Sequence, residues 1–275
     1  MKRAAIIIAM LGMSCWGFTQ DKPAGQSVPA GQAAAAPAGK RPPQAKTQPE
    51  FDAYKAAIAL TDAAAQEKAA NEFAAKFPDS ELRAVLYKAV MHSYLQANNA
   101  DKTMEMAQKV LSYDADDPEA LVGVAQVLAE RTHDTDLDRD QRLADARKDA
   151  QRALVTVDTD VPSSGYPPEQ LNAFKNLLRS NAYEILGTLD YNAKNWTDAE
   201  GNLRKSIEAY PQQLDPIAIL RLSLALDQEN KYAEALKYAN QAVELTKEGT
   251  ASGDAARKEK DRLTQLTGGA PPAKN

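Results

Sequence analysis

The residues with the clearest capacity for metal chemistry lie in one short acidic stretch. Aspartates alternate at positions 134, 136, 138 and 140, directly after His133. Alternating carboxylates are typical of calcium loops, but the EF-hand pattern requires Gly at its sixth position and Glu at its twelfth. Counted from Asp134, these positions hold Arg139 and Asp145. We therefore interpret residues 131–141 as a solvated acidic insert that leads into a helix, and a calcium-responsive module is the less favoured alternative.

Residue sets that could support catalysis are missing from the sequence. The two histidines, His92 and His133, fall in different predicted units, and there is no H-E-x-x-H, no cysteine–histidine set and no G-x-S-x-G. Net charge is −5 at pH 7, with acidic and basic residues interspersed, so no basic surface for nucleic acid is predicted. We predict that the protein is not an enzyme and has no cofactor, metal or nucleic-acid partner. His92 is interpreted as an ordinary, half-exposed polar residue.

Helices are the elements expected to position these residues. Alanine dominates the apolar residues, aromatic residues make up 6% of the chain, and β-branched runs are nearly absent after residue 20. Alanine is the strongest helix former, so the composition predicts an all-α fold. With 275 residues, of which 44% are hydrophobic, the chain is long enough to bury a sizeable core.

Residues 180–247 contain two copies of one helix-hairpin pattern. Sixteen residues separate the first bulky position from a small alanine in both copies, and the next small position follows after 7 more. The first copy contains Tyr183, Leu186, Gly187, Trp196, Ala199, Leu203, Ser206 and Pro211. The second copy contains Ile219, Leu222, Ser223, Tyr232, Ala235, Ala239 and Ala242. Residues 84–117 follow the same spacing, with Tyr87 and Thr103 separated by 16.

This pattern resembles the tetratricopeptide repeat (TPR), a helix–turn–helix unit of ~34 residues. The resemblance implies a TPR-like α-solenoid of antiparallel helix pairs, of the exported bacterial type. Gly187 and Ala199 are expected where the two helices of a pair approach closely, and Trp196 is expected to close the turn. Thr197 and Glu200 predict a capping box at the start of the second helix. The repeat-packing residues are Tyr183, Leu186, Gly187, Trp196, Ala199, Leu203, Pro211, Leu222, Tyr232 and Ala235.

The predicted segments follow one another from an exported leader to a short tail. Residues 49–79 form an N-terminal helix pair that caps the solenoid, and residues 80–247 hold the repeats. The repeats lie at about 84–117, 118–160, 169–215 and 216–247. A polar helix at 250–267 should cover the open end with Ala255, Leu263 and Leu266, and residues 268–275 form a tail.

The N-terminus has the features of a cleaved export signal. Lys2 and Arg3 precede an apolar run of ten residues at 4–13, which is too short to span a bilayer. We predict a signal peptide at 1–19 and a mature protein of the periplasm or cell envelope without a transmembrane span. A lipid anchor at Cys15 is less favoured, because the lipidation pattern requires Leu where Gly12 stands.

Residues 20–48 are rich in Ala, Pro, Gly, Gln and Lys and contain almost no large apolar residue. Such a composition buries too little surface to offset the entropy of ordering, so it predicts a disordered linker. A proline-rich ligand segment is the alternative, but no PxxP repeat supports it.

The resemblance also implies a concave groove lined by the first helix of each repeat. The candidate partner-binding residues carried over from the family are Lys88, His92, Gln96, Gln126, Asn181, Glu184, Tyr191, Asn192 and Arg221. The same register places Ile217 and Leu224 on this face. A clamp for a peptide carboxylate requires several Lys and Asn residues, whereas the cations here are Lys88 and Arg221 in distant repeats. An extended or helical protein segment, bound by polar and apolar contacts, is therefore the favoured partner.

These observations predict a non-enzymatic scaffold or adaptor in the bacterial cell envelope, which binds a protein or peptide segment in the groove. The alternative is a structural component of an outer-membrane biogenesis or secretion complex, anchored by lipid if Cys15 is modified.

Overall fold

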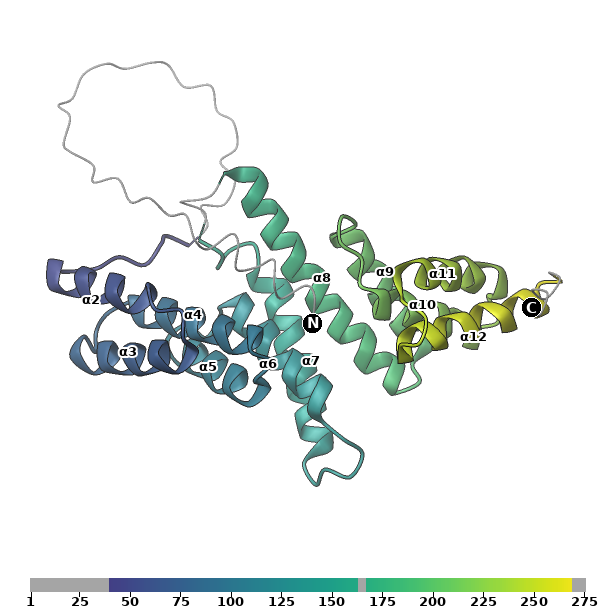
Figure 1. The fold of residues 1–275 in the computed structure, drawn as a ribbon, viewed down its shortest axis with the longest axis horizontal. Coiled ribbons are helices and arrows are strands. Elements are labelled where there is room, and N and C mark those ends of the chain that lie inside the picture. Colours follow the sequence, from purple (N-terminus) through teal and green to yellow (C-terminus); the bar gives the residue numbers. More distant parts are fainter. Residues whose placement is uncertain (1–39, 163–166, 269–275) are drawn as a thin grey trace, which may run out of the picture.

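The computed structural model describes residues 40–162 and 167–268, and within these ranges the regular structure consists of 11 helices without a strand (Figure 1). The helices are α2 (Gln48–Ile58), α3 (Ala63–Lys76), α4 (Leu82–Gln96), α5 (Ala100–Tyr113), α6 (Pro118–Arg131), α7 (Arg139–Thr156), α8 (Pro168–Asn192), α9 (Trp196–Ala209), α10 (Pro216–Gln228), α11 (Tyr232–Leu245) and α12 (Ala251–Leu266). The predicted signal peptide at 1–19 lies outside the described residues, as do residues 20–39 of the linker and 269–275 of the tail.

Consecutive helices pack as antiparallel pairs, and each pair packs against the next. The pairs are α4 with α5, α6 with α7, α8 with α9, and α10 with α11. Each pair also contacts its neighbour, as α5 does with α6 and α9 with α10. The predicted all-α solenoid of antiparallel helix pairs is therefore confirmed.

One long helix joins the two halves of the molecule. Figure 1 shows α2–α7 on one side and α9–α12 on the other, with the 25-residue α8 between them. The first turns of α8 pack Phe174 and Leu178 against Val157 and Val161, which follow α7. The remainder of α8 packs against α6, α9 and α10. The halves are thus connected by continuous helix rather than by a loop.

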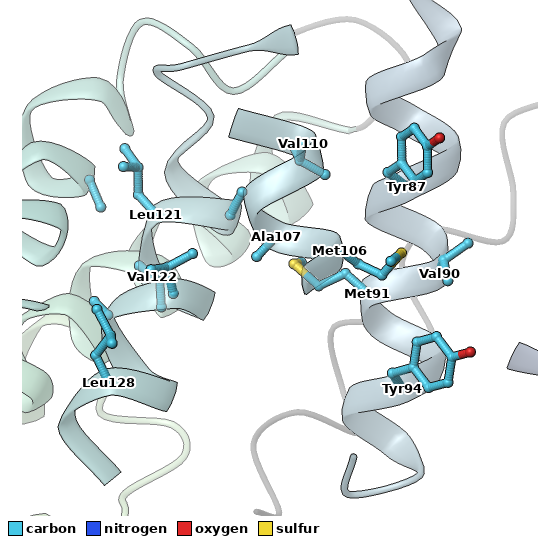
Figure 2. Close-up of a cluster of buried hydrophobic side chains, with 14 of the residues drawn as sticks. Tyr87, Val90, Met91, Tyr94, Met106, Ala107, Val110, Leu121, Val122 and Leu128 are labelled. Atoms are coloured by element: carbon cyan, nitrogen blue, oxygen red, sulfur yellow. The ribbon is translucent and has the colours of Figure 1, made fainter. Parts of the chain in front are cut away.

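The core of the first half has its largest share of buried residues on α4, α5 and α6, and α2, α3 and α7 add to it. Figure 2 shows Met91 of α4 facing Met106 and Ala107 of α5, between the rings of Tyr87 and Tyr94. Met106 and Ala107 are fully buried. This cluster continues through α6 to Leu186 and Leu189 of α8, so the first half and α8 share one core.

In the second half, small residues set how closely the helices approach. A Cβ on Gly187 would lie 2.7 Å from Cγ of Leu203, so α8 and α9 leave no space for any side chain at this position. Ala199 and Ala235 are fully buried. Ser180 Oγ donates a hydrogen bond to the carbonyl oxygen of Ser206 at 2.7 Å, which allows a small polar group to be buried in the same contact.

In three of the pairs, the turn between the two helices contains a residue with a left-handed backbone conformation. Asn98, Lys194 and Asn230 have positive φ angles of 53°, 62° and 61°. After each of them, a backbone N–H bonds back to the preceding helix, for example Asn195 N to Asp190 O at 2.9 Å. This is the left-handed ending that commonly terminates helices, and it satisfies carbonyls at the end of the first helix.

The predicted capping box at the start of α9 is wrong. The cap residue is Asn195, one place before Trp196, and it makes no side-chain cap hydrogen bond. Thr197 Oγ1 instead donates to Glu229 Oε1 of the next repeat at 2.5 Å. Glu200 bonds to Arg204 at 2.9 Å and to Lys231 at 2.6 Å. Thr197 and Glu200 therefore bond to Glu229 and Lys231 of the next repeat instead of capping α9. The sequence pattern of one repeat could not show these partners.

The predicted linker 20–48 also requires correction at its C-terminal end. Residues 40–47 contact the helical body, and Thr47 caps α2, which begins at Gln48. Lys40 pairs with Asp114 at 2.5 Å and Arg41 with Glu81 at 2.5 Å. These ion pairs supply the ordering contacts that the apolar composition of the segment could not.

The last helix, α12, packs on α11 and α10, at the position predicted for a terminal cap. It does so through Ala256 and Leu263, which are buried, whereas Ala255 and Leu266 are exposed. The buried alanine of α12 is therefore Ala256 and not the predicted Ala255. Within residues 40–162 and 167–268, no helix combines the length and apolarity that crossing a bilayer requires.

Candidate partner-binding face

The candidate groove residues lie on α4, α6, α8 and α10, the first helices of the four pairs. We call this set of positions the groove face. The structure divides it into an α4–α6 part, with Lys88, His92, Gln96 and Gln126, and an α8–α10 part, with Asn181, Glu184, Tyr191, Asn192 and Arg221.

In the α4–α6 part, four ionisable side chains meet between α4 and the start of α6. His92 Nε2 bonds to Glu119 Oε1, and Lys88 Nζ pairs with Asp117 Oδ2. Lys88 Nζ also lies 3.6 Å from Glu119 Oε2. His92 is only 4% exposed, so its interpretation as a half-exposed polar residue is wrong. Glu119, from the next repeat, provides the partner that permits the imidazole to be buried.

The charges of this quartet compensate one another. Burial alone would raise the pKa of Glu119, but the adjacent charges and hydrogen bonds of His92 and Lys88 lower it to about 2. Burial would lower the pKa of Lys88, but the carboxylates of Asp117 and Glu119 raise it overall. Asp117 also caps α6 by accepting from Ala120 N at 2.9 Å. The quartet therefore stabilises the α4–α6 contact and presents little unpaired charge to a ligand.

The other two candidates of this part are Gln96 of α4 and Gln126 of α6. Gln96 is exposed at the last position of α4. Gln126 is half-buried, and its Nε2 donates to Glu130 Oε1 at 2.9 Å on the same helix. The structure therefore brings Lys88 and His92 together, while Gln96 and Gln126 remain separate from the quartet.

The α8–α10 part has a different character, because its one arginine contacts a neutral hydroxyl group. Arg221 Nη1 donates to Thr188 Oγ1 at 3.0 Å, and no carboxylate within the described residues forms a salt bridge with Arg221. Tyr191 packs edge-on against Trp196, with ring centroids 5.3 Å apart. Burial raises the pKa of Tyr191, with Arg221 acting in the opposite direction.

Apolar side chains are accessible beside these polar groups. Ile217 is 45% exposed and Leu224 is half-buried, both on α10. Asn181 and Glu184 are half-buried on α8, and Asn192 is exposed at its end. The α8–α10 part thus combines accessible apolar surface with one arginine and several amide or hydroxyl groups, which suits a protein segment rather than a small charged ligand.

The end of the α8–α10 part is closed by a residue that the sequence analysis missed. Arg262 of α12 pairs with Asp227 of α10 and lies 3.2 Å from Glu259. Asp227 Oδ1 is buried and accepts no hydrogen bond within the described residues. The sequence of this polar helix does not indicate that Arg262 pairs with Asp227, because the pairing depends on where α12 packs.

The predicted repeat-packing residues lie mostly beneath this face. Those that are buried are Leu186, Gly187, Ala199, Leu203, Leu222 and Ala235. Tyr183, Trp196 and Tyr232 are half-buried at the edges of the helix pairs, and Pro211 is exposed just after α9 ends. These residues position the face but offer a partner little contact.

The acidic insert forms ion pairs of its own. Asp134 and Asp140 both bond to Arg139, at 3.1 and 2.8 Å. Asp136 accepts from the backbone N–H of His133 at 2.9 Å, and Asp138 occupies the cap position of α7. Across the described parts of the chain, no three His, Cys, Asp or Glu side chains group closely enough to hold a metal ion.

Comparison with known proteins informs the fold. No protein-family profile matches the chain, and no curated protein matches it. Among solved structures, PilF of Pseudomonas aeruginosa is similar over 81% of this chain and 96% of its own, with 17% identity and a TM-score of 0.52. A MamA protein is similar over 71% of this chain and 88% of its own, with 17% identity and a TM-score of 0.48. The likeness to PilF supports a TPR-like fold.

Proposed function

We propose that this protein is a non-enzymatic interaction scaffold, and that a partner protein segment binds along the α8–α10 part of the groove face. The observation that carries the proposal is the exposed Ile217, which lies on α10 with the half-buried Leu224. Solvated apolar groups next to an arginine without a carboxylate partner among the described residues form a surface that gains by being covered.

The α4–α6 part is a weaker candidate for the same role. Its charged groups are already paired with residues of the neighbouring repeat, so a ligand would have to break the quartet to use them. The partner best suited to the α8–α10 part is an extended or helical segment with an apolar side chain for Ile217 and Leu224 and an acceptor for Arg221.

Site-specific photo-crosslinking in the native host tests this proposal. A photoreactive phenylalanine replaces Tyr191, and in a second strain it replaces Val155, which is 66% exposed on α7. We expect a discrete crosslinked partner from position 191 and not from position 155. Equal crosslinking at both positions would contradict the proposed face.

A matched pair of substitutions then tests specificity. Ile217→Asp should abolish the crosslink from position 191, whereas Val155→Asp should leave it unchanged. Aspartate at position 217 lies in the first turn of α10, where the helix dipole favours a negative charge, so the fold should be retained. A crosslink that survives Ile217→Asp would overturn the assignment of this surface.

We further propose that the scaffold operates in the bacterial cell envelope, as a protein exported by residues 1–19. Lys2, Arg3 and the apolar run 4–13 support this proposal. Mass spectrometry of the mature protein provides the test. An N-terminus beyond residue 15 is expected, a diacylated Cys15 would instead favour an anchored assembly component, and an intact Met1 in the cytoplasmic fraction would contradict export.

A further inference from the structure

A second contact surface lies at the edge of the first half, where the carbonyl oxygen of Asp114 accepts a hydrogen bond from the backbone nitrogen of Asp117 at 3.2 Å. It is formed by the segments that link successive helix pairs and contributes Glu81 before α4, Asp114 after α5 and Asp160 after α7. We call these three residues the acidic edge. Residues 40–47, which we call the strap, pass along this edge before α2 begins. Figure 1 shows the strap as an extended trace that runs between α2 and the middle of the molecule.

The two sides of this contact are complementary in charge. Arg41 makes two hydrogen bonds to the carboxylate of Glu81, at 2.8 and 2.5 Å, which is a specific bidentate arrangement. Lys40 Nζ bonds to Asp114 at 2.5 Å and lies 3.5 Å from Asp160. Lys46 Nζ donates to the backbone oxygen of Asp79 at 2.8 Å. Each of the three strap cations therefore has an oxygen partner on the body.

The backbone of the strap is held as well as its side chains. Lys40 N donates to the carbonyl oxygen of Thr159 at 2.9 Å, and Lys46 N donates to Glu50 Oε2 at 2.7 Å. Pro42 and Pro43 between them favour extended backbone, because proline fixes its own φ angle and restricts the residue before it. Ala45 packs against the main core.

These contacts are of a kind that a competitor can replace. The Arg41 and Glu81 side chains are 65% and 41% exposed, and exposed ion pairs contribute little stability and are screened by salt. Because the strap belongs to the same chain, it has a high effective concentration at the edge, and this allows individually weak ion pairs to hold it there.

We propose that the acidic edge is a docking site for extended, basic, proline-containing protein segments, and that the strap is its intramolecular occupant. A partner segment of this type binds only by displacing residues 40–47. Displacement releases the eight residues 40–47, which span up to ~26 Å when fully extended.

The first experiment asks whether the ion pairs hold the strap in place. Trypsin cleaves after Lys40 and Lys46 but not after Arg41, which precedes proline, so Arg41→Glu alters the contact without removing a cleavage site. In the full chain, we expect Arg41→Glu to accelerate cleavage after Lys46, whose flanking residues are unchanged, as quantified by mass spectrometry. The double variant Arg41→Glu/Glu81→Arg should restore protection, because it reverses the ion pair.

Lys68→Glu is the matched control, since Lys68 is 80% exposed and lies 3.9 Å from its partner Glu72 on the same helix. It makes the same kind of charge reversal on α3 and should leave cleavage after Lys40 and Lys46 unchanged. Unaltered cleavage in Arg41→Glu, or no rescue in the double variant, would overturn the assignment of the strap.

The second experiment asks whether the edge binds such a segment in trans. The probe is a fluorescein-labelled peptide with the sequence of residues 37–48, measured by fluorescence polarisation. We expect it to bind the full-chain Arg41→Glu variant with a Kd ~10-fold lower than that of the wild type, because the site is vacated. Adding Glu81→Lys and Asp114→Lys to that variant should abolish binding.

Equal peptide affinity for the wild type and Arg41→Glu, binding that survives reversal of the edge, or no binding to either protein would each refute the docking site. A peptide with glutamate at the positions of Lys40, Arg41 and Lys46 controls for nonspecific association and should not bind. Ile217→Asp should not alter peptide binding, which separates this surface from the α8–α10 part of the groove face.

Discussion

The α4–α6 and α8–α10 parts of the groove face occupy equivalent repeat positions but carry different chemistry. In the first, Lys88 and His92 are paired with carboxylates of the next repeat and are largely buried. In the second, Arg221 bonds only to a neutral hydroxyl among the described residues, and Ile217 remains exposed. The repeat register therefore fixes where a side chain lies, while the adjacent repeat decides whether it remains available to a partner.

The largest expected effect comes from breaking the paired charges of the α4–α6 part. Lys88→Met leaves Asp117 and Glu119 as neighbouring carboxylates without their shared lysine. Removing one partner of a buried ion pair costs ~3–5 kcal/mol, and the 20% exposure of the Lys88 side chain places the expected loss near the lower end. Urea unfolding followed by circular dichroism measures this loss.

Lys231→Met is the matched control in the other half. Lys231 forms comparable ion pairs with Glu200 and Glu229, but its side chain is 46% exposed. Its removal should leave the unfolding midpoint nearly unchanged. If the two variants lost equal stability, burial would not be what distinguishes the two regions.

The second prediction uses pH to examine the same contrast. The pKa of Glu119 in the folded chain is about 2, below its ordinary value of 4.5. Ionised Glu119 therefore stabilises the folded state fully above pH ~4.5, and this contribution is lost as the pH falls toward 2. Glu119→Gln should flatten the stability profile in this window. Hydrogen exchange should show that α4 and α6 open more readily at pH 3 than at pH 6 in the wild type, and an equal pH dependence in Glu119→Gln would contradict this role of Glu119.

The third prediction concerns close packing in the second half. Gly187→Ala places a Cβ 2.7 Å from Cγ of Leu203 and 3.1 Å from its backbone nitrogen, so the two helices must separate. Overpacking of this kind costs ~1–3 kcal/mol. Thermal unfolding measures the loss, and an unchanged midpoint would show that α8 and α9 can adjust freely.

The smallest effect is expected at Gly123 of α6, a glycine of the first half that faces the preceding repeat. A Cβ on Gly123 would lie 3.4 Å from Sδ of Met91 and 3.8 Å from Cβ of Ala107, which are ordinary contacts with a flexible and a small neighbour. Gly123→Ala should raise stability by ~0.5–1 kcal/mol, because alanine is the better helix former. A destabilised Gly123→Ala variant would remove the difference between the halves that the packing predicts.

The sequence was sufficient to predict the helix pairs, because their packing depends on spacing within one repeat. Gly187 and Ala199 show this, since they are small residues at the positions where the two helices of one pair meet. The pairing of His92 with Glu119 could not be predicted in the same way. It joins residues 27 positions apart in different repeats, and its formation depends on how one repeat is rotated against the next.

Residues 40–47 illustrate the same limit at longer range. Their composition lacks large apolar residues, which correctly indicates that they build no core of their own. Their order depends on Glu81 and Asp114, which are up to 74 positions away and come together only after α3–α6 have packed. A prediction from local composition has no access to that information.

The continuous α8 also has a mechanical consequence. At 25 residues and ~1.5 Å per residue it is a strut ~37 Å long, rooted at one end beside α7 and at the other against α9. Its backbone hydrogen bonds resist bending, so a force applied at α10 is transmitted to α6 instead of being absorbed by a hinge. A displacement of α9–α12 is thereby transmitted to α2–α7.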